Sequence, residues 1–206
     1  MTVPGTFDTS ARELIHAGLQ NLDEARSLFR QLSASGFDAA RCGLLLDALQ
    51  HVCDPDVALR NLVDIVNAQV SQGRALDDIV PDDTAFRQLV AVLGVSDAMG
   101  KLMRFRPDLV QAAATDHCNS HLYNHDQRRA HVLESVGADP NDRMSPTATM
   151  DLADAATALR RTYRNQLAAI IAQDTMSDDP IALQPRISSE PVSYTHLRAH
   201  ETPEHL

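Results

Sequence analysis

The chain has 206 residues and a formal net charge of −10, with 28 acidic side chains against 18 Lys and Arg. An acidic surface of this kind opposes binding to nucleic acid and to anionic membranes, so neither partner is expected. Apolar residues make up 44% of the sequence, aromatic residues only 4%, and Trp is absent. The core must therefore consist of Leu, Val, Ile and Ala, which favours packed helices over β-sheets.

Neither a signal peptide nor a membrane span is predicted. The first ten residues are polar, and the longest apolar runs, such as 167–172, are far shorter than a spanning segment. The three cysteines are an odd number and lack a framework spacing, which argues against a secreted disulfide-rich domain. We therefore expect a cytoplasmic protein.

Helix signals begin near residue 10. Ser10 and Glu13 have the spacing of a capping box, in which each residue bonds to the backbone N–H of the other. The apolar period then predicts a helix over about 21–33, which Gly36 ends. Asp38 is the expected cap of the helix that follows.

The dipeptide Asp54-Pro55 marks the clearest restart in the chain. Asp is a preferred helix cap, and Pro is well tolerated at the first helical position. The helix that it opens is expected to end at Gly73. Its apolar face is Leu59, Leu62, Val63, Val66 and Val70.

Three further helices are predicted before residue 114. The first starts at Asp83 or Thr84 and is expected to end before Gly94. Ser96 caps a short helix, and Pro107 opens another.

The remaining part of the helical region is less regular. Residues 115–127 are polar and predict no single structure, and a helix is expected over about 129–136. Ser145-Pro146 repeats the cap-then-Pro start, so a long last helix is predicted from there to about Ala172. Its packing seam reads Leu152, Ala156, Leu159, Tyr163, Leu167 and Ile170, and we expect it to be at least half buried.

These elements predict an all-α fold, a bundle or array of helices over residues 1–176. Residues 177–185 have the composition of a linker. Residues 186–206 lack a helical period, and the stretch 192–202 resembles translated sequencing-adapter read-through. We therefore expect 186–206 to be a disordered, non-native tail.

Three stretches carry a family resemblance. The segment 54–62 is similar to a P-D-x-A-L-x-x-L motif, and 89–109 is similar to L-x-x-x-L-G-x-S followed by a short helix and an H-P-E-L turn. In that turn Arg106 stands where His is common. The segment 159–174 is similar to a basic helix of the form L-R-R-x-x-R-x-x-L-x-x-I-x-x-x-D. In this order and spacing they resemble the N-terminal half of bacterial glutamine synthetase adenylyltransferases, which both transfer and remove adenylyl groups.

The resemblance implies an enzyme that transfers AMP from ATP to a tyrosine of glutamine synthetase and removes it again by phosphorolysis. It implies glutamine synthetase and a nitrogen-signalling regulatory protein as partners. Mg²⁺ and ATP are implied for the full-length family, with a helical front followed by a nucleotidyltransferase fold. That fold carries a G-x-G-K-L-G-G stretch and an S-D-x-D pair whose carboxylates would hold the metal.

Neither catalytic motif is found in this chain. Gly100-Lys101-Leu102 is a chance triplet within a predicted helix. The D-x-D formed by Asp54 and Asp56 lies at a helix start, where a capping role is expected. We therefore predict no catalytic residue, no bound cofactor and no metal ligand in this chain, and no activity of the chain alone.

Rival sites were weighed against that prediction. His117, His121 and His125 would share one face of a continuous helix, with Cys118 beside them, and two could bind Zn²⁺ or Ni²⁺. The alternative is a polar connector, which the neighbouring Asn and Ser residues favour.

Nucleophilic and anion-binding roles were also considered. Cys42, Cys53 and Cys118 could act with His51 or His117, but Cys42 and Cys53 lie in apolar helical contexts, where thiols are inert. A basic group on the last helix could meet phosphate or a further domain, or could simply be a solvated face. Its members are Arg160, Arg161 and Arg164.

A second interpretation of the whole chain stays open at this point. A free-standing helical protein-interaction module would share the same pattern of helices without any enzyme attached. The nucleotide sequence beyond the 3′ end separates the two, because only the enzyme continues into an S-D-x-D motif.

Overall fold

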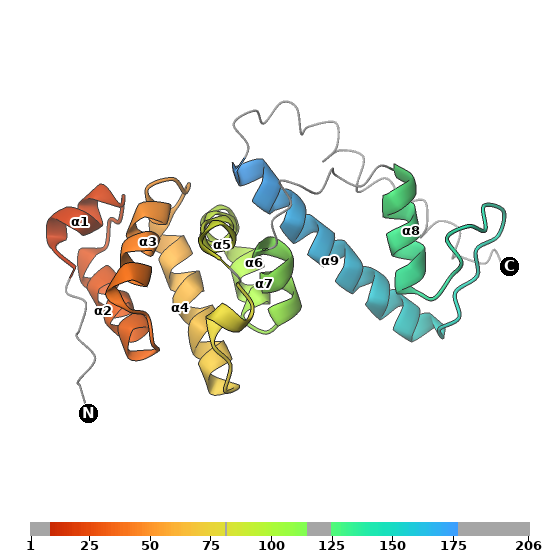
Figure 1. Cartoon of the computed structure of the whole chain (residues 1–206), viewed down its shortest axis with the longest axis horizontal. Helices are drawn as coiled ribbons and strands as arrows, with labels where there is room; N and C mark the ends of the chain where they lie inside the picture. The colour runs from red at the N-terminus through yellow and green to blue at the C-terminus, as the bar shows by residue number, and fades with distance from the viewer. Residues whose placement is uncertain (1–8, 81, 115–124, 177–206) are drawn as a thin grey trace, which may run out of the picture. The chain divides into compact units, whose positions relative to one another are not determined.

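The computed structural model describes residues 9–80, 82–114 and 125–176. These residues form nine α-helices and one short 3-10 helix, and no strand occurs among them, which confirms the all-α prediction (Figure 1). The chain divides into two compact units, Met1–Asp116 and His117–Leu206.

The first unit contains seven of the α-helices. α4 packs against α2, α5 and α6, while α5 also contacts α3 and α7, so this pair forms the centre of the unit. The helices are α1 (Ala11–His16), α2 (Leu22–Ala34), α3 (Ala39–Leu49), α4 (Pro55–Ser71), η1 (Leu76–Asp78), α5 (Asp83–Val95), α6 (Asp97–Met103) and α7 (Pro107–Ala114).

The core of the first unit is aliphatic, as its composition predicts. Its largest fully buried side chains are two Phe residues surrounded by Leu, Ile and Met. They come from α1 to α6: Leu14, Phe29, Leu32, Leu45, Leu49, Leu59, Leu62, Ile65, Phe86, Leu89, Leu93 and Met103.

The predicted helix starts in this unit are confirmed. Ser10 and Glu13 form the expected capping box at α1. The carboxylates of Asp38 and Asp54 accept backbone N–H bonds at the starts of α3 and α4, and the Ser96 hydroxyl does so for α6. At the other ends, Gly36 and Gly73 have positive φ angles of 104° and 70°, which a side chain would oppose.

One predicted helix end was wrong. α5 does not stop before Gly94 but continues through it to Val95. The glycine is needed for packing, because a Cβ at this position would lie 2.9 Å from the Cβ of Val52. Gly94 therefore allows α5 to approach the segment around Val52 closely, and it does not end the helix.

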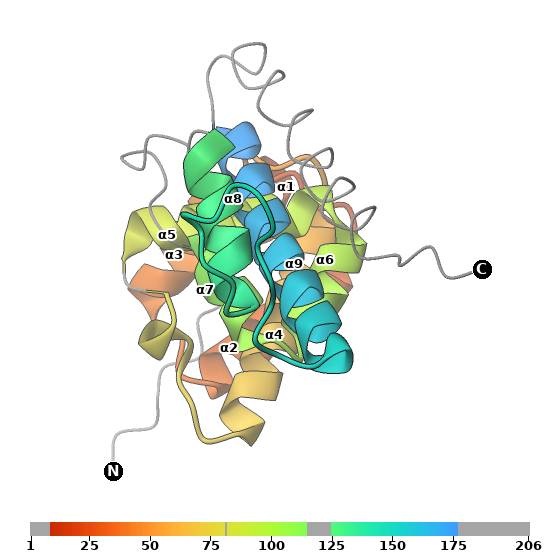
Figure 2. The same ribbon diagram turned by 90° about the vertical axis from the view of Figure 1, so that its right-hand side faces the viewer.

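The second unit contains α8 (His125–Ser135) and α9 (Leu152–Met176). They contact each other, and Figure 1 shows them converging where α8 ends and α9 begins; Figure 2 shows the same pair from the side. A small cluster of buried residues holds them together, and Leu159 packs at its edge. The cluster consists of Leu133, Val136, Ala138 and Ala155.

The predicted start of the last helix was wrong. Ser145-Pro146 lies within a loop, and α9 begins at Leu152, where the Asp151 carboxylate accepts the N–H of Asp154. The reason is local: the Asp142 carboxylate accepts the N–H groups of both Met144 and Ser145, which turns the chain there. The first residue of the predicted seam, Leu152, is 74% exposed. The other five members are at least partly buried, as expected.

None of the helices among the described residues combines the length and the apolar character that crossing a membrane requires. The predicted linker 177–185 and tail 186–206 lie outside the described residues.

Candidate functional site

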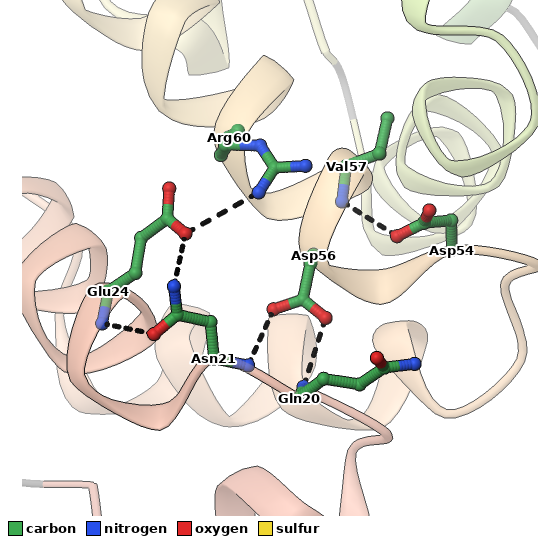
Figure 3. A network of polar contacts seen from close by, with 7 residues as sticks. All are labelled: Gln20, Asn21, Glu24, Asp54, Asp56, Val57 and Arg60. Carbon is green, nitrogen blue, oxygen red and sulfur yellow. Dashed lines mark hydrogen bonds and ion pairs between the residues drawn. The ribbon is translucent and has the colours of Figure 1, made fainter.

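The first motif of the sequence forms the start of α4. The Asp54 Oδ1 accepts the N–H of Val57 at 2.9 Å, which is the capping bond expected from the sequence. Two residues later, Asp56 points to a different part of the chain. Its Oδ2 accepts the N–H of Gln20 at 2.9 Å, and its Oδ1 accepts the N–H of Asn21 at 3.2 Å (Figure 3).

Asp56 therefore fixes the link between α1 and α2 to the start of α4. Asn21 also caps α2, because its Oδ1 accepts the N–H of Glu24, and its side-chain amide donates to the Glu24 carboxylate. Arg60, one turn along α4, approaches the same carboxylate at 3.5 Å (Figure 3). The network joins segments about 36 positions apart and has a structural role.

This geometry tests whether the D-x-D could hold Mg²⁺. Metal-dependent phosphoryl chemistry requires carboxylate oxygens that converge on one point. Here both oxygens of Asp56 are occupied by backbone N–H groups on α1–α2, while Asp54 bonds to its own helix (Figure 3). The two carboxylates do not fit a shared metal ion.

The other acidic residues of the predicted helix starts and loops also have partners within the protein. Asp38 and Asp82 cap α3 and α5, and Asp83 pairs with Arg41 at 3.6 Å. Asp139 accepts the N–H of Asn141 within a turn.

The second motif includes a buried polar contact that the sequence did not reveal. Asn61 on α4 is 5% exposed, and its side-chain amide donates to the carbonyl of Leu93 on α5 at 3.3 Å. Gly100 on α6 lies directly against it, since a Cβ at that position would overlap the Asn61 side chain. Gly100 therefore serves helix packing, which agrees with the interpretation of Gly100-Lys101-Leu102 as a chance triplet.

Arg106, which replaces the usual His of the second motif, forms a two-pronged ion pair. Its Nε donates to the Oδ1 of Asp108 at 2.9 Å, and one terminal nitrogen donates to Oδ2 at 2.7 Å. The hydrogen bonds to Asp108 raise the pKa of Arg106 above its ordinary value. The pair lies at the start of α7, where the Arg106 carbonyl accepts the N–H of Leu109.

The third motif lies along α9. Arg160 and Arg161 are exposed, and Arg164 is partly buried. An anion-binding group and a solvated basic face both fit these positions.

The cysteine hypothesis finds no support in the described residues. Cys42 is fully buried in α3, and burial raises the pKa of its thiol, which disfavours the reactive thiolate. Cys53 corrects the sequence interpretation, because it is exposed and lies in the bend after α3, outside any helix. The chain bends here because Asp54 must cap the start of α4. This requirement ends the helical apolar pattern from which the sequence interpretation placed Cys53 in a helix.

The histidine hypothesis lies largely outside the described residues. This holds for His117, Cys118 and His121, and for the side chain of His125 at the start of α8. Elsewhere in the part of the chain that the structure describes, no group of three or more His, Cys, Asp or Glu could hold a metal ion. The absence of catalytic and cofactor-binding residues stays a prediction.

A groove of about 430 Å³ between α3, α4 and η1 was not foreseen. At its edge the guanidinium of Arg41 lies 4.3 Å from the centre of the Phe86 ring and donates to Asp77 at 2.9 Å. Arg41 and Asp77 are 36 positions apart, so no short-range signal connects them.

Comparison with known proteins identifies relatives of the chain. It is 61% identical over 184 residues to the bifunctional glutamine synthetase adenylyltransferase/adenylyl-removing enzymes of Bifidobacterium longum strains DJO10A and NCC 2705. The corresponding enzyme of Corynebacterium efficiens is 33% identical over 168 residues, or 66% of this chain. No family model matches the chain, and no solved structure matches it.

The alignment covers 89% of this chain but only 17% of the Bifidobacterium enzymes. The chain thus spans about a sixth of the length of the curated relatives that it matches. The family resemblance predicted from the three motifs is confirmed: the chain matches one part of enzymes of that family.

Proposed function

Because the chain matches one part of bifunctional glutamine synthetase adenylyltransferase/adenylyl-removing enzymes, we propose that it serves as a helical segment of such an enzyme. The whole protein would transfer AMP from ATP to a tyrosine of glutamine synthetase and remove it by phosphorolysis to give ADP. A nitrogen-signalling protein would regulate both reactions in the cytoplasm. The observation that carries the proposal is the identity of 61% over 184 residues.

The role of this segment within the enzyme would be that of scaffold and partner contact. Its motif residues support this role, because each of those described makes structural contacts: Asp54 caps α4, Asp56 fixes the α1–α2 link, and Gly100 packs against Asn61. The Mg²⁺ and ATP of the family would bind to a nucleotidyltransferase domain encoded beyond this segment.

The proposal is tested with two polypeptides. The 206-residue chain is incubated with adenylylated glutamine synthetase, orthophosphate and Mg²⁺, and ADP release is followed. We expect no turnover above a protein-free control, because nucleotidyl transfer needs converging carboxylates to place the metal. A polypeptide extended through the flanking genomic sequence should release ADP.

Two outcomes would contradict the proposal. Turnover by the chain alone would reveal a catalytic site within it. A stop codon close to residue 178 in the genomic sequence, with no S-D-x-D motif downstream, would instead support the free-standing interaction module.

A further inference from the structure

The groove between α3, α4 and η1 has a mixed lining, in which each of these three elements contributes apolar side chains that lie beside polar and charged ones. Val66 is buried in its wall, Leu44 is partly buried, and Val70 at the last turn of α4 is 49% exposed. Leu76 closes the groove from the η1 side. Its volume of about 430 Å³ lies in the range of cavities that accept apolar groups of a ligand or partner.

The rim of this groove is negative toward solvent. Asp38, Asp77 and Asp83 all line it and are exposed, with 79% of the Asp77 side chain and 74% of the Asp83 side chain accessible. The single cation of the lining, Arg41, is turned inward, with a side chain only 19% exposed. Because Arg41 lies on the Phe86 ring and pairs with two of these carboxylates, its charge is largely satisfied within the protein.

A groove with apolar side chains and an acidic rim is complementary to an apolar side chain flanked by cations. Complementary charges raise the rate of encounter and suppress wrong partners, while the apolar side chains of the lining add affinity. Because Arg41 offsets only one of the three negative charges in the lining, an anionic segment would meet a net negative charge.

The exposed carboxylates of the rim also affect the kind of contact that the groove can make. Charges that face solvent are screened by salt, so a contact that uses them depends on ionic strength.

We propose that this groove binds a segment of a partner protein in which an apolar side chain lies beside Lys or Arg. The site is independent of the proposed enzyme activity, because it uses only contacts within the first unit. Val70 and Leu44 receive the apolar side chain, and Asp77 and Asp83 face the cations.

The test uses three short capped peptides as probes and the 206-residue chain as receptor. One peptide has leucine between lysines, the second has leucine between glutamates, and the third has serine between lysines. Binding is followed by methyl and amide chemical shifts in an isotope-labelled chain. We expect shifts at Leu44, Val66 and Val70 with the first peptide, at least about tenfold tighter binding than for the second, and weaker binding at high salt.

Two pairs of variants separate the groove from the general surface. Val70→Ser should weaken binding of the first peptide roughly threefold or more, as expected for lost apolar contact. Val95→Ser is its matched control, because Val95 is similarly exposed at 47% but lies outside the groove. Asp77→Asn combined with Asp83→Asn should remove most of the salt dependence of peptide binding. Asp23→Asn is the control and should not, because Asp23 lies on α2 outside the groove and its side chain is 97% exposed.

Several results would overturn the proposal. Equal binding of all three peptides, or equal effects of Val70→Ser and Val95→Ser, would show that the groove does not select this chemistry. Concentration-dependent shifts at the groove without peptide would identify a second copy of the chain as the occupant. Loss of peptide binding in the polypeptide extended by its flanking sequence would show that the same polypeptide covers the groove.

Discussion

In the first unit, Phe86, Leu89 and Leu93 of α5 are out of contact with solvent, and α5 packs against four other helices, α3, α4, α6 and α7. Among the described residues of the second unit, the cluster between α8 and α9 has four buried members, two of them alanine. A core that small buries little apolar surface for the chain that it orders.

In the second unit, a polar side chain fixes the loop that connects the two helices. The two terminal nitrogens of Arg129 donate to the carbonyls of Pro140 and Asp142, each at 2.8 Å, which fixes the connecting loop onto α8. In the first unit the corresponding polar contacts, such as the Asp56 network, hold the edge of a fold whose centre is already packed. We therefore expect the first unit to lose most stability when a buried apolar side chain is truncated. In the second unit, changes that release the connecting loop should matter more.

The largest effect is expected for Phe86→Ala. The side chain is fully buried, contacts the Arg41 guanidinium and lies 6.2 Å from the Phe37 ring, so truncation leaves a cavity at the centre of the first unit. We expect a loss of about 3–5 kcal/mol in the free energy of unfolding. Residue-resolved hydrogen exchange should show the loss in α4 and α5. An equal loss in α8 would show that the two units unfold together.

Leu159→Ala should have a smaller effect, confined to the second unit. Leu159 is partly buried at the edge of the small cluster, so we expect about 2 kcal/mol, the lower end for such truncations. Hydrogen exchange in α8 and α9 measures it, with Leu152→Ala on the 74% exposed side chain as control. A loss below about 0.5 kcal/mol would mean that the seam contributes no packing.

Asp56→Ala should cost about 1–2 kcal/mol, because it removes the acceptor of two backbone N–H groups while the packed core remains. The exchange of the Gln20 and Asn21 amides should accelerate more than that of α5 amides. Asp23→Ala, at a nearby and highly exposed carboxylate, is the control. Equal acceleration of Gln20 and Asn21 amide exchange in both variants would show that Asp56 has no special role in fixing this link.

The smallest effect is a pH dependence of the second unit. The N–H groups of Ser145 and Met144 hold the pKa of Asp142 below its ordinary value. A carboxyl whose pKa is lower in the folded state stabilises that state above its unfolded pKa of about 4. This stabilisation is lost as pH falls through the lower, folded value. Hydrogen exchange of the loop should therefore show a stability difference between the wild type and Asp142→Asn that shrinks below about pH 4. A constant difference would contradict the assignment.

The helix starts could be predicted because a cap acts within three or four residues of itself. Ser10, Asp38, Asp54 and Ser96 each bond to the backbone just ahead of them, so the short sequence around each contains all the information. Ser145-Pro146 has the same local pattern, but Asp142 occupies the N–H of Ser145, and the helix starts later.

The candidate sites were harder to predict because their contacts join distant parts of the chain. The pattern around Asp56 indicates a helix start and gives no sign of Gln20, 36 positions earlier. The same limit applies to Arg41 and Asp77, which form the edge of the groove. The family could nevertheless be predicted, because its evidence was the order of three motifs along the chain.

The contact between Asn61 and Gly100 has an evolutionary consequence. No side chain fits at position 100 while asparagine occupies position 61, so a single substitution at either place removes a contact or creates an overlap. We expect the two positions to change together during divergence, with any residue larger than glycine at 100 accompanied by a smaller one at 61. Such paired replacement would let the α4–α6 spacing persist while both residues that now set it are exchanged.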